Sequence, residues 1–302
     1  MQRPPDEGRV LEKLTEWGTT QSSVRALILT SSRARRDASA DLLSDYDLVL
    51  AVTDLQRFEK EDEWISDYGR PIVRWGDQST LYGLTTVFRG VLYEDYVKID
   101  YSVWPDTMLD RISAEPHLPD CLDVGYRVIL DKDNRSSRWK PPSYKAHIPA
   151  RPTESEYRTV IEEFWWEATY VARSLQRGDL VFAKFSLDYQ IKLEVMRRMF
   201  EWRIEIEHRW RIRPGVYGRN MNRLMPADIW EQWSRTYVWS ELEENWVALF
   251  RTTELFRRVA REVGATLGHT YPAQLDDEVT AYLNALRTLP GEVKGALEPL
   301  RS

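Results

Sequence analysis

The strongest constraint on the fold is a change of hydrophobic pattern near residue 140. Before it, short apolar runs of strand length alternate with polar loops and short helical patterns. The runs predict strands at 24–30, 45–52, 71–75, 81–89, 93–104 and 127–131, with helices at about 7–17 and 55–68. Strands mixed with helices are typical of a mixed α/β domain built around one sheet.

The second half of the chain follows a different, helical pattern. Four prolines between residues 141 and 152 make a linker-like stretch, and Thr153 with Glu156 behind it forms a capping-box signature. Helices are expected at about 153–176, 179–210, 220–233, 240–267 and 276–289. We therefore expect an α+β protein, with a mixed-sheet domain over residues 1–137 and an all-helical bundle over residues 138–302.

Composition excludes several classes of protein. The 302 residues include a single cysteine, Cys121, which excludes a disulfide framework and a zinc site with several cysteines. No apolar run approaches the roughly 18 residues needed to span a bilayer, and the first residues lack the apolar core of a secretory signal, so a cytoplasmic protein without a membrane partner is expected. A net charge of −6 argues against a nucleic-acid partner and suits a cationic one.

Three aspartates carry the most suggestive chemistry. Asp45 and Asp47 open the second expected strand and, two residues apart, point the same way, while Asp100 lies in a later strand. If the strands are neighbours, three carboxylates converge, and such a cluster needs a cation. Mg²⁺ prefers oxygen ligands and commonly takes one or two carboxylates together with substrate phosphates. The alternative is an ordinary solvated strand end, which a D-x-D pattern alone more often marks.

The turn after the first strand fits the same chemistry. Ser32 can offer its hydroxyl and backbone N–H to phosphate oxygens, and Arg33 can meet the remaining negative charge. Neither a GxGxxG nor a GxxxxGK[ST] loop is present, so a nucleotide would be bound by another route. Asp100 can ligate a metal, accept the proton of an attacking hydroxyl, or do both.

The strand, small-Ser turn, D-x-D and later strand Asp together resemble the DNA polymerase β-like nucleotidyltransferase superfamily. More narrowly, the chain resembles the aminoglycoside 6-adenylyltransferases, which modify streptomycin, on the segments VRALILTSSR, SDYDLVLAV, KIDYSVWP, LDKDN, PPS, PTE, EFWW, FAKFSLD, MFEW and IEHRW. These segments occur in that family's order from about residue 22 to about residue 290.

The resemblance implies transfer of AMP from ATP to a streptomycin hydroxyl with release of pyrophosphate. Carried over residue by residue, the resemblance implies that Asp45, Asp47 and Asp100 are the catalytic residues and Mg²⁺ ligands, with Asp100 as third ligand or general base. Ser31, Ser32 and Arg33 would contact the triphosphate, and Lys184 would reach its phosphates from the helical half. One position departs from the family, because Ser31 stands where Gly is usual.

The guanidinium groups of streptomycin require carboxylates and aromatic faces. The candidate substrate residues are Glu94, Asp95, Glu162, Glu163, Trp165, Trp166 and Asp188. Adjacent tryptophans on one helix cannot both face the same way, so at least one of Trp165 and Trp166 is expected in the core.

A monomer or a weak homodimer is expected.

Two rival functions stay open. One is an enzyme of the same superfamily that acts on another hydroxyl compound or on a protein side chain. The other is a catalytically silent protein that binds nucleotide or drug, which Ser31 keeps open and the three intact aspartates oppose.

Overall fold

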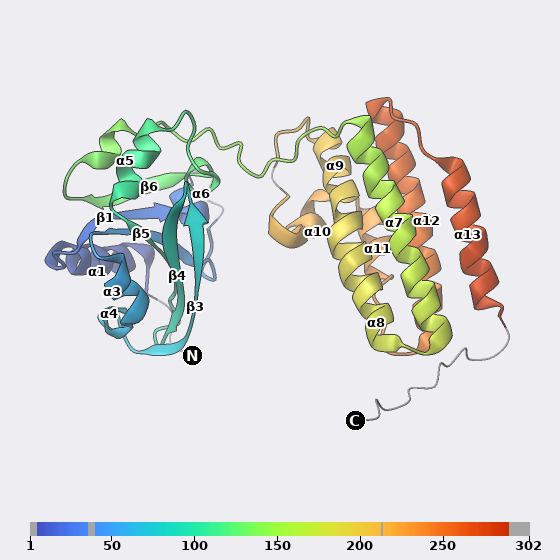
Figure 1. Cartoon of the computed structure of the whole chain (residues 1–302), viewed down its shortest axis with the longest axis horizontal. Coiled ribbons are helices and arrows are strands. Elements are labelled where there is room, and N and C mark those ends of the chain that lie inside the picture. The colour runs from blue at the N-terminus through green and yellow to red at the C-terminus, as the bar shows by residue number, and fades with distance from the viewer. Residues whose placement is uncertain (1–4, 36–39, 213, 290–302) are drawn as a thin grey trace, which may run out of the picture. The chain divides into compact units, whose positions relative to one another are not determined.

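The chain forms two compact units, Met1–His147 and Ile148–Ser302 (Figure 1). The computed structural model describes residues 5–35, 40–212 and 214–289. Each unit has its own hydrophobic core, and this confirms the expected α+β fold with a mixed sheet in the first half and helices in the second. None of the helices among the described residues is both long enough and apolar enough to cross a bilayer.

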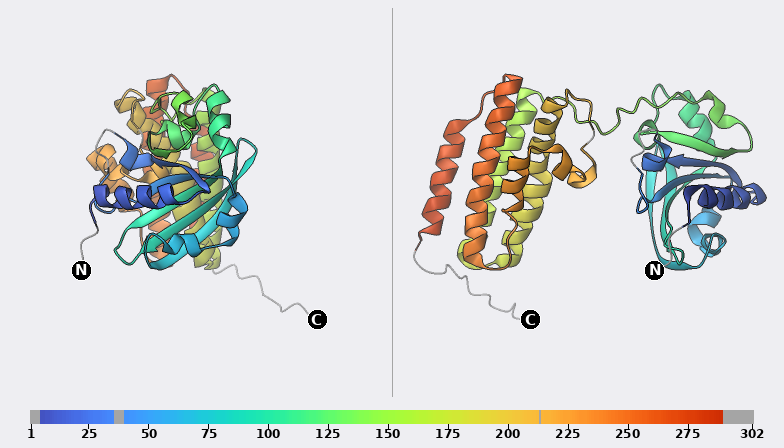
Figure 2. Two further views of the ribbon diagram at one scale, coloured as in Figure 1. Left: turned by 90° about the vertical axis from the view of Figure 1, so that its left-hand side faces the viewer. Right: turned by 180° about the vertical axis from the view of Figure 1, so that it is seen from behind.

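The first unit is built on one six-stranded sheet in the order β3-β4-β5-β2-β1-β6 (Figures 1 and 2). Its strands are β1 (Val24–Thr30), β2 (Tyr46–Val52), β3 (Pro71–Leu81), β4 (Leu84–Tyr93), β5 (Lys98–Pro105) and β6 (Tyr126–Asp131). The β2–β5 pair is parallel and the other neighbouring pairs are antiparallel. The parallel pair lies in the middle of the sheet, where both of its edges are hydrogen-bonded.

Helices cover the two faces of this sheet unequally. The helices are α1 (Glu7–Thr20), α2 (Ser31–Ala34), α3 (Leu55–Lys60), α4 (Glu63–Ser66), α5 (Thr107–Ala114), α6 (Asp120–Asp123) and the 3₁₀ turn η1 (Arg135–Arg138). Side chains of α1, α3 and α4 share a core with one face. Side chains of α5 and α6 share a second core with part of the other face, around Ile28, Val49 and Trp104.

Turn chemistry accounts for the main differences from the expected strands. Tyr82 and Gly83 both have positive φ, as a two-residue hairpin turn requires, so β3 extends to Leu81 and β4 begins only at Leu84. The expected strand 93–104 starts later, at Lys98, because β4 ends at Tyr93 and a turn follows it. The expected helix 55–68 is divided into α3 and α4.

The stretch after β6 packs on the first unit, so contacts divide after His147 and not after residue 137. Trp139 is buried in the core that α5 and α6 share, and its indole N–H donates to the carbonyl of Leu109 at 3.0 Å. Further along, Ser143 bonds to the Asp123 carboxylate through its hydroxyl and its backbone N–H. Proline content alone does not reveal these contacts.

The second unit is a bundle of helices packed around one core (Figure 2). Its members are α7 (Glu154–Arg177), α8 (Leu180–Lys184), the π-helix η2 (Phe185–Met196), α9 (Arg197–Glu207), the 3₁₀ turn η3 (Val216–Gly218), α10 (Met221–Leu224), α11 (Ala227–Ser234), α12 (Leu242–Leu267) and α13 (Ala273–Arg287). The capping box at Thr153 and Glu156 is present, as expected. The run from α8 to α9 is continuous, as expected, but its middle is wound as a π-helix, which hydrophobic spacing does not predict.

Candidate functional site

Strand register places two of the three aspartates side by side. In the parallel pair, Asp47 of β2 is the direct partner of Asp100 of β5, and both side chains lie on the face that α5 and α6 only partly cover. Asp45 lies immediately before β2. The expected proximity of these strands is therefore present, and it rests on a pairing between segments about 50 residues apart.

A lysine joins the remaining aspartate to this pair. The Lys98 ammonium donates to Asp45 Oδ2 at 2.7 Å and to Asp100 Oδ2 at 3.0 Å. Burial lowers the pKa of Lys98, but its bonds to the two carboxylates outweigh that effect and the net shift is upward. Lys98 thus supplies the positive charge that the acidic cluster needs when no other cation is bound.

The environment of Asp47 disfavours the charged form of its carboxyl. Burial is the main cause, and the neighbouring charges of Asp100 and Asp45 add to it, so that the pKa of Asp47 rises to about 6. A hydrogen bond from Ser31 and the charge of Lys98 act in the opposite direction. A carboxyl with this environment favours a further cation beside it.

The turn after β1 has the backbone geometry that favours glycine. Ser31 has φ of 58°, in the left-handed region. Its hydroxyl is hydrogen-bonded to Asp47, so the side chain that strains the turn also contacts the acidic cluster. Ser32 follows in α2, at the end of the strand that pairs with β2.

The Arg33 side chain is held against the loop that carries Asp45. Its guanidinium donates to the backbone carbonyls of Ser44 and Asp45 and stacks over the Tyr46 ring at 4.0 Å. The side chain is only 10% exposed. The side chain holds the loop that carries Asp45, and the contact of this guanidinium with the triphosphate stays a prediction.

The carboxylate oxygens of Asp45, Asp47 and Asp100 are ligands that suit Mg²⁺, although the three side chains are not arranged around a common point. Among the described residues, no three His, Cys, Asp or Glu side chains stand in a metal-holding arrangement. However, Asp100 Oδ1 is buried and has no hydrogen-bond partner among the described residues. Gly90, opposite Asp100 on β4, leaves that oxygen its room, since a Cβ there would lie 3.2 Å from it. An unpartnered buried carboxylate oxygen beside two more carboxylates is a suitable ligand for a hard cation.

Lys184 is bound within the helical unit. Its ammonium lies 2.5 Å from Asp188 and donates to the carbonyl of Val238 at 2.8 Å. Asp188 also accepts from Lys192, which is fully buried and whose pKa burial lowers to about 8. The roles predicted for Lys184 with phosphate and for Asp188 with substrate therefore require these partners to be exchanged, and both roles stay predictions.

The predicted substrate residues of α7 divide into core and surface. Trp165 is fully buried among the bundle side chains, which removes it from the candidates. Trp166 is 62% exposed, while Glu162 pairs with Arg158 and Glu163 pairs with Arg198 on the helix surface. The part of these three residues in binding a substrate stays a prediction.

Glu94 and Asp95 lie in the turn between β4 and β5. Glu94 pairs with Arg70 at 2.8 Å, and Asp95 accepts from the Tyr68 hydroxyl at 3.3 Å. Tyr68 belongs to the core on the opposite face of the sheet from the aspartate cluster. These contacts indicate a structural role for both acids, and their role with substrate is not supported by them.

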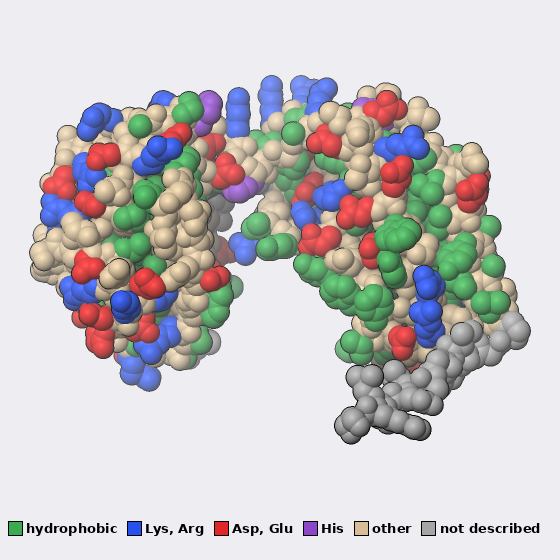
Figure 3. Space-filling view, in the orientation of Figure 1, with side chains coloured by type: hydrophobic (Ala, Val, Ile, Leu, Met, Phe, Trp, Pro, Cys, Tyr) green, Lys and Arg blue, Asp and Glu red, His purple; other side chains and the backbone are tan. Residues whose placement is uncertain are grey.

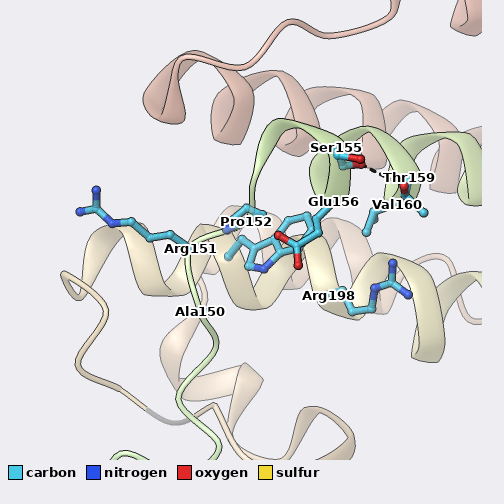
Figure 4. A pocket seen from close by; sticks show the side chains of 9 residues that line it. Ala150, Arg151, Pro152, Ser155, Glu156, Thr159, Val160 and Arg198 are labelled. Carbon is cyan, nitrogen blue, oxygen red and sulfur yellow. Dashed lines mark hydrogen bonds between the residues drawn. The ribbon is translucent and has the colours of Figure 1, made fainter.

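A cavity of about 360 Å³ lies within the helical unit at the start of α7. Glu156 of the capping box and Arg198 of α9 line it, together with Trp202. Arg151 and Arg198 extend to opposite sides of the Glu156 carboxylate (Figure 4), so they do not converge on one anion. None of the predicted site residues lines this cavity.

Sequence reasoning missed Lys98 and Gly90. Lys98 precedes Asp100 by two residues in one strand, so the two-residue period places it on the same face, and that signal was available. A glycine inside a strand indicates a close approach, but only strand pairing reveals that Asp100 is its neighbour.

Comparison with known proteins gives one consistent result. The sequence pattern of the family described as streptomycin adenylyltransferase matches residues 6–286. An aminoglycoside 6-adenylyltransferase of Campylobacter jejuni is 27% identical over 282 residues, covering 92% of this chain and 94% of that protein. One from Bacillus subtilis (strain 168) is 27% identical over 284 residues, with 93% and 97% covered. A crystal structure of an aminoglycoside 6-adenyltransferase from Bacillus subtilis is 24% identical, covers 94% of this chain and 100% of that chain, and has a TM-score of 0.47.

Proposed function

The chain belongs to the streptomycin adenylyltransferase family, and on that basis we propose that it transfers AMP from ATP to a hydroxyl of streptomycin in a Mg²⁺-dependent reaction that releases pyrophosphate. It is a nucleotidyltransferase, and its relatives support adenylyl transfer to an aminoglycoside as a resistance activity. The observation that best supports the proposed chemistry is the register that sets Asp47 beside Asp100, with Lys98 bonded to both Asp45 and Asp100.

The proposed reaction is a displacement at the α-phosphorus of ATP. The substrate hydroxyl oxygen bonds to this phosphorus, the bond from it to the oxygen bridging to the β-phosphorus breaks, and pyrophosphate leaves with that oxygen. The hydroxyl proton passes to a carboxylate. We assign that role to Asp100, whose Oδ1 is buried and has no hydrogen-bond partner among the described residues.

Asp45 and Asp47, together with Asp100, are the residues that would hold Mg²⁺. When bound there, Mg²⁺ neutralises the carboxylates and the phosphate oxygens, which is its usual contribution to phosphoryl transfer. Lys98 compensates the charge of Asp45 and Asp100 in the metal-free protein through one oxygen of each, which leaves Asp100 Oδ1 available to a metal. The pKa of Asp47, near 6, means that this carboxyl is largely ionised at pH 7.5.

The backbone of the turn at Ser31 and Ser32 is the proposed contact for the triphosphate. It stands at the end of β1, next to the strand that carries Asp47. We assign Arg33 as a positioning residue that fixes the Asp45 loop through the carbonyls of Ser44 and Asp45. Loss of the Arg33 side chain would then misplace Asp45.

A catalytically silent binding protein is the second candidate, and the observation that favours it is Ser31. An L-residue at φ of 58° is strained and places a side chain where the family has none. Binding of ATP without pyrophosphate release would support this candidate.

The test is pyrophosphate release from ATP and Mg²⁺ in the presence of individual aminoglycosides. We expect release that depends on streptomycin, and a loss of at least a hundredfold in the Asp45→Asn variant, because a metal ligand is removed. Glu12→Gln is the matched control, since Glu12 is an exposed acid on α1 outside the cluster. If none of the aminoglycosides in the panel gives pyrophosphate release, the proposal is contradicted. It is also contradicted if the Asp45→Asn variant releases pyrophosphate as fast as the wild type.

A further inference from the structure

On the sheet face that carries Asp47 and Asp100, α5 and α6 of the first unit cover only one end. Along β2 and β5, Val49, Ala51 and Trp104 are buried beneath α5 and α6. Toward the other end of the same face, where Asp47 and Asp100 lie, the side chains become half-buried or exposed. The uncovered part continues across β4 and onto the edge strand β3.

An aromatic pair lies on this uncovered end. The register places Trp75 of β3 opposite Gly90 of β4, and Gly90 opposite Asp100 of β5, so Trp75 shares a face with Asp100. Trp75 is 63% exposed, and its ring packs on that of Phe88 with centroids 5.6 Å apart. Gly90 between them adds no side chain, and a Cβ there would lie 3.2 Å from both the Phe88 ring and Asp100 Oδ1, so the aromatic pair adjoins Asp100.

At the β3–β4 edge of the sheet, acidic and basic side chains lie on opposite faces. Asp77 faces the same way as Trp75, is exposed, and has no ion-pair partner in the part of the chain that the structure describes. Arg74 and Arg89 occupy the alternate positions, which face the other side of the sheet, and both pair with Asp62 there. Among these described residues, the face of Trp75 combines aromatic rings with carboxylates, and the Lys98 ammonium is bonded to Asp45 and Asp100.

We propose that Trp75, Phe88 and Asp77 form the subsite that binds a guanidinium group of the aminoglycoside. This inference rests on the proposed function and names the part of the chain that selects its substrate. A guanidinium stacks on an aromatic ring and forms bidentate bonds with a carboxylate, so a surface that offers both suits it. The Asp77 carboxylate, which lies outside the proposed Mg²⁺ cluster, would repel the triphosphate of ATP.

The spacing suits a substrate that also reaches Asp100. Strands in a sheet lie about 4.8 Å apart, so β3 and β5, two strands apart, are separated by about 10 Å. One substituted ring of an aminoglycoside can bridge this distance. A cationic group held on Trp75 would thus leave a hydroxyl of the same molecule near Asp100.

The test compares streptomycin binding and turnover by the full-length wild-type protein and its Trp75→Ala and Asp77→Asn variants. Trp75 lies exposed on an edge strand, so its truncation should not unfold the protein. We expect the dissociation constant for streptomycin, from calorimetry without ATP, to rise about tenfold in each variant. The KM for streptomycin should rise in parallel, while the KM for ATP stays within about twofold. Trp75→Phe should keep most of the affinity.

Trp239→Ala is the matched control, because Trp239 is 86% exposed in the helical unit. If the wild type transfers AMP to streptomycin and both variants bind it equally well, the subsite is wrong and the proposed function stands. A rise in the KM for ATP alone would also overturn the subsite, because the ring would then hold the nucleotide. If the wild type neither binds nor modifies streptomycin, both proposals fail together.

Discussion

At the scale of single residues, the turn at Ser31 combines two opposing effects. Its left-handed backbone costs about 1–2 kcal/mol for an L-residue, while its hydroxyl is hydrogen-bonded to Asp47. The family resemblance implies that glycine is usual at this position. Glycine suits this position because φ is positive there. The serine instead adds a hydrogen bond to Asp47.

We predict that Ser31→Gly is more stable than Ser31→Ala by about 1 kcal/mol, because both lose the hydroxyl and only alanine keeps the strain. At an ordinary φ the order would be reversed. Urea unfolding of the two variants at pH 7.5 measures the difference. Pyrophosphate release by Ser31→Gly should equal or exceed that of the wild type. Loss of pyrophosphate release in this variant would show that the serine hydroxyl is required.

Asp47 links stability to pH. Its pKa near 6 in the folded protein exceeds the ordinary value of 3.8, so the folded state binds the proton more tightly than the unfolded one. The contribution of Asp47 to stability is therefore largest below about pH 4 and is lost as pH rises through about 6.

From this linkage we predict that Asp47→Asn raises the free energy of unfolding of the metal-free protein by about 2 kcal/mol at pH 8 and by much less at pH 4. Urea unfolding at the two pH values, with chelator present, measures the gain. The same variant should lose adenylyl transfer. A gain of equal size at both pH values would show that the carboxyl's ionisation is not its cause.

At the scale of elements, the central feature is the parallel pair of β2 and β5. Alternation in the sequence predicts that Asp45 and Asp47 share a side, and the later strand of Asp100 was also expected. Strand order could not be predicted in the same way, because pairing depends on packing between segments far apart in the chain. Only that order shows that Gly90, Trp75 and Phe88 lie on the same face of the sheet as Asp100.

Gly90 tests the packing of β4 against the cluster. A Cβ at this position would lie 3.2 Å from both Asp100 Oδ1 and the Phe88 ring, so one of them must move. We predict that Gly90→Ala lowers kcat at least tenfold while the free energy of unfolding changes by less than about 1 kcal/mol. Gly69→Ala is the control, because its Cβ would meet Tyr93 at an ordinary 3.7 Å. Unchanged turnover in Gly90→Ala would show that Asp100 tolerates displacement.

A buried ion pair joins the last two long helices. Asp276 of α13 is buried and accepts two bonds from Arg257 of α12 and one from Tyr271. Burial opposes the charge of Asp276, but these bonds outweigh it and lower its pKa. The pair links α13 to α12.

We predict that Asp276→Ala destabilises the protein by about 3 kcal/mol, because it leaves the Arg257 charge partly buried without a partner. Asp277→Ala, one residue further on and exposed, should change stability by less than about 0.5 kcal/mol. Thermal unfolding of both variants at pH 7.5 measures the difference. Equal effects at the two positions would contradict the assigned role of the pair.

At the scale of the whole molecule, the sequence predicts a sheet-containing half and a helical half, and the structure confirms this division of secondary structure. It misplaces residues 138–147, because the contacts of Trp139 and Ser143 with the first unit are long-range. It also assigns Trp165 to substrate, although the periodicity of α7 alone does not show which of two adjacent tryptophans faces the bundle core. The space-filling view shows hydrophobic side chains gathered on the surface of the helical unit, so exposure of an aromatic residue does not by itself identify a site (Figure 3).

The most direct test of the account is the transfer of labelled AMP from ATP to streptomycin by the full chain and by its Asp100→Asn variant. We predict a labelled streptomycin product with the wild type and a rate at least a hundredfold lower with the variant, which keeps the shape of the side chain but cannot accept the proton. A variant that forms the product at the wild-type rate would contradict the account, because Asp100 would then have no part in the chemistry.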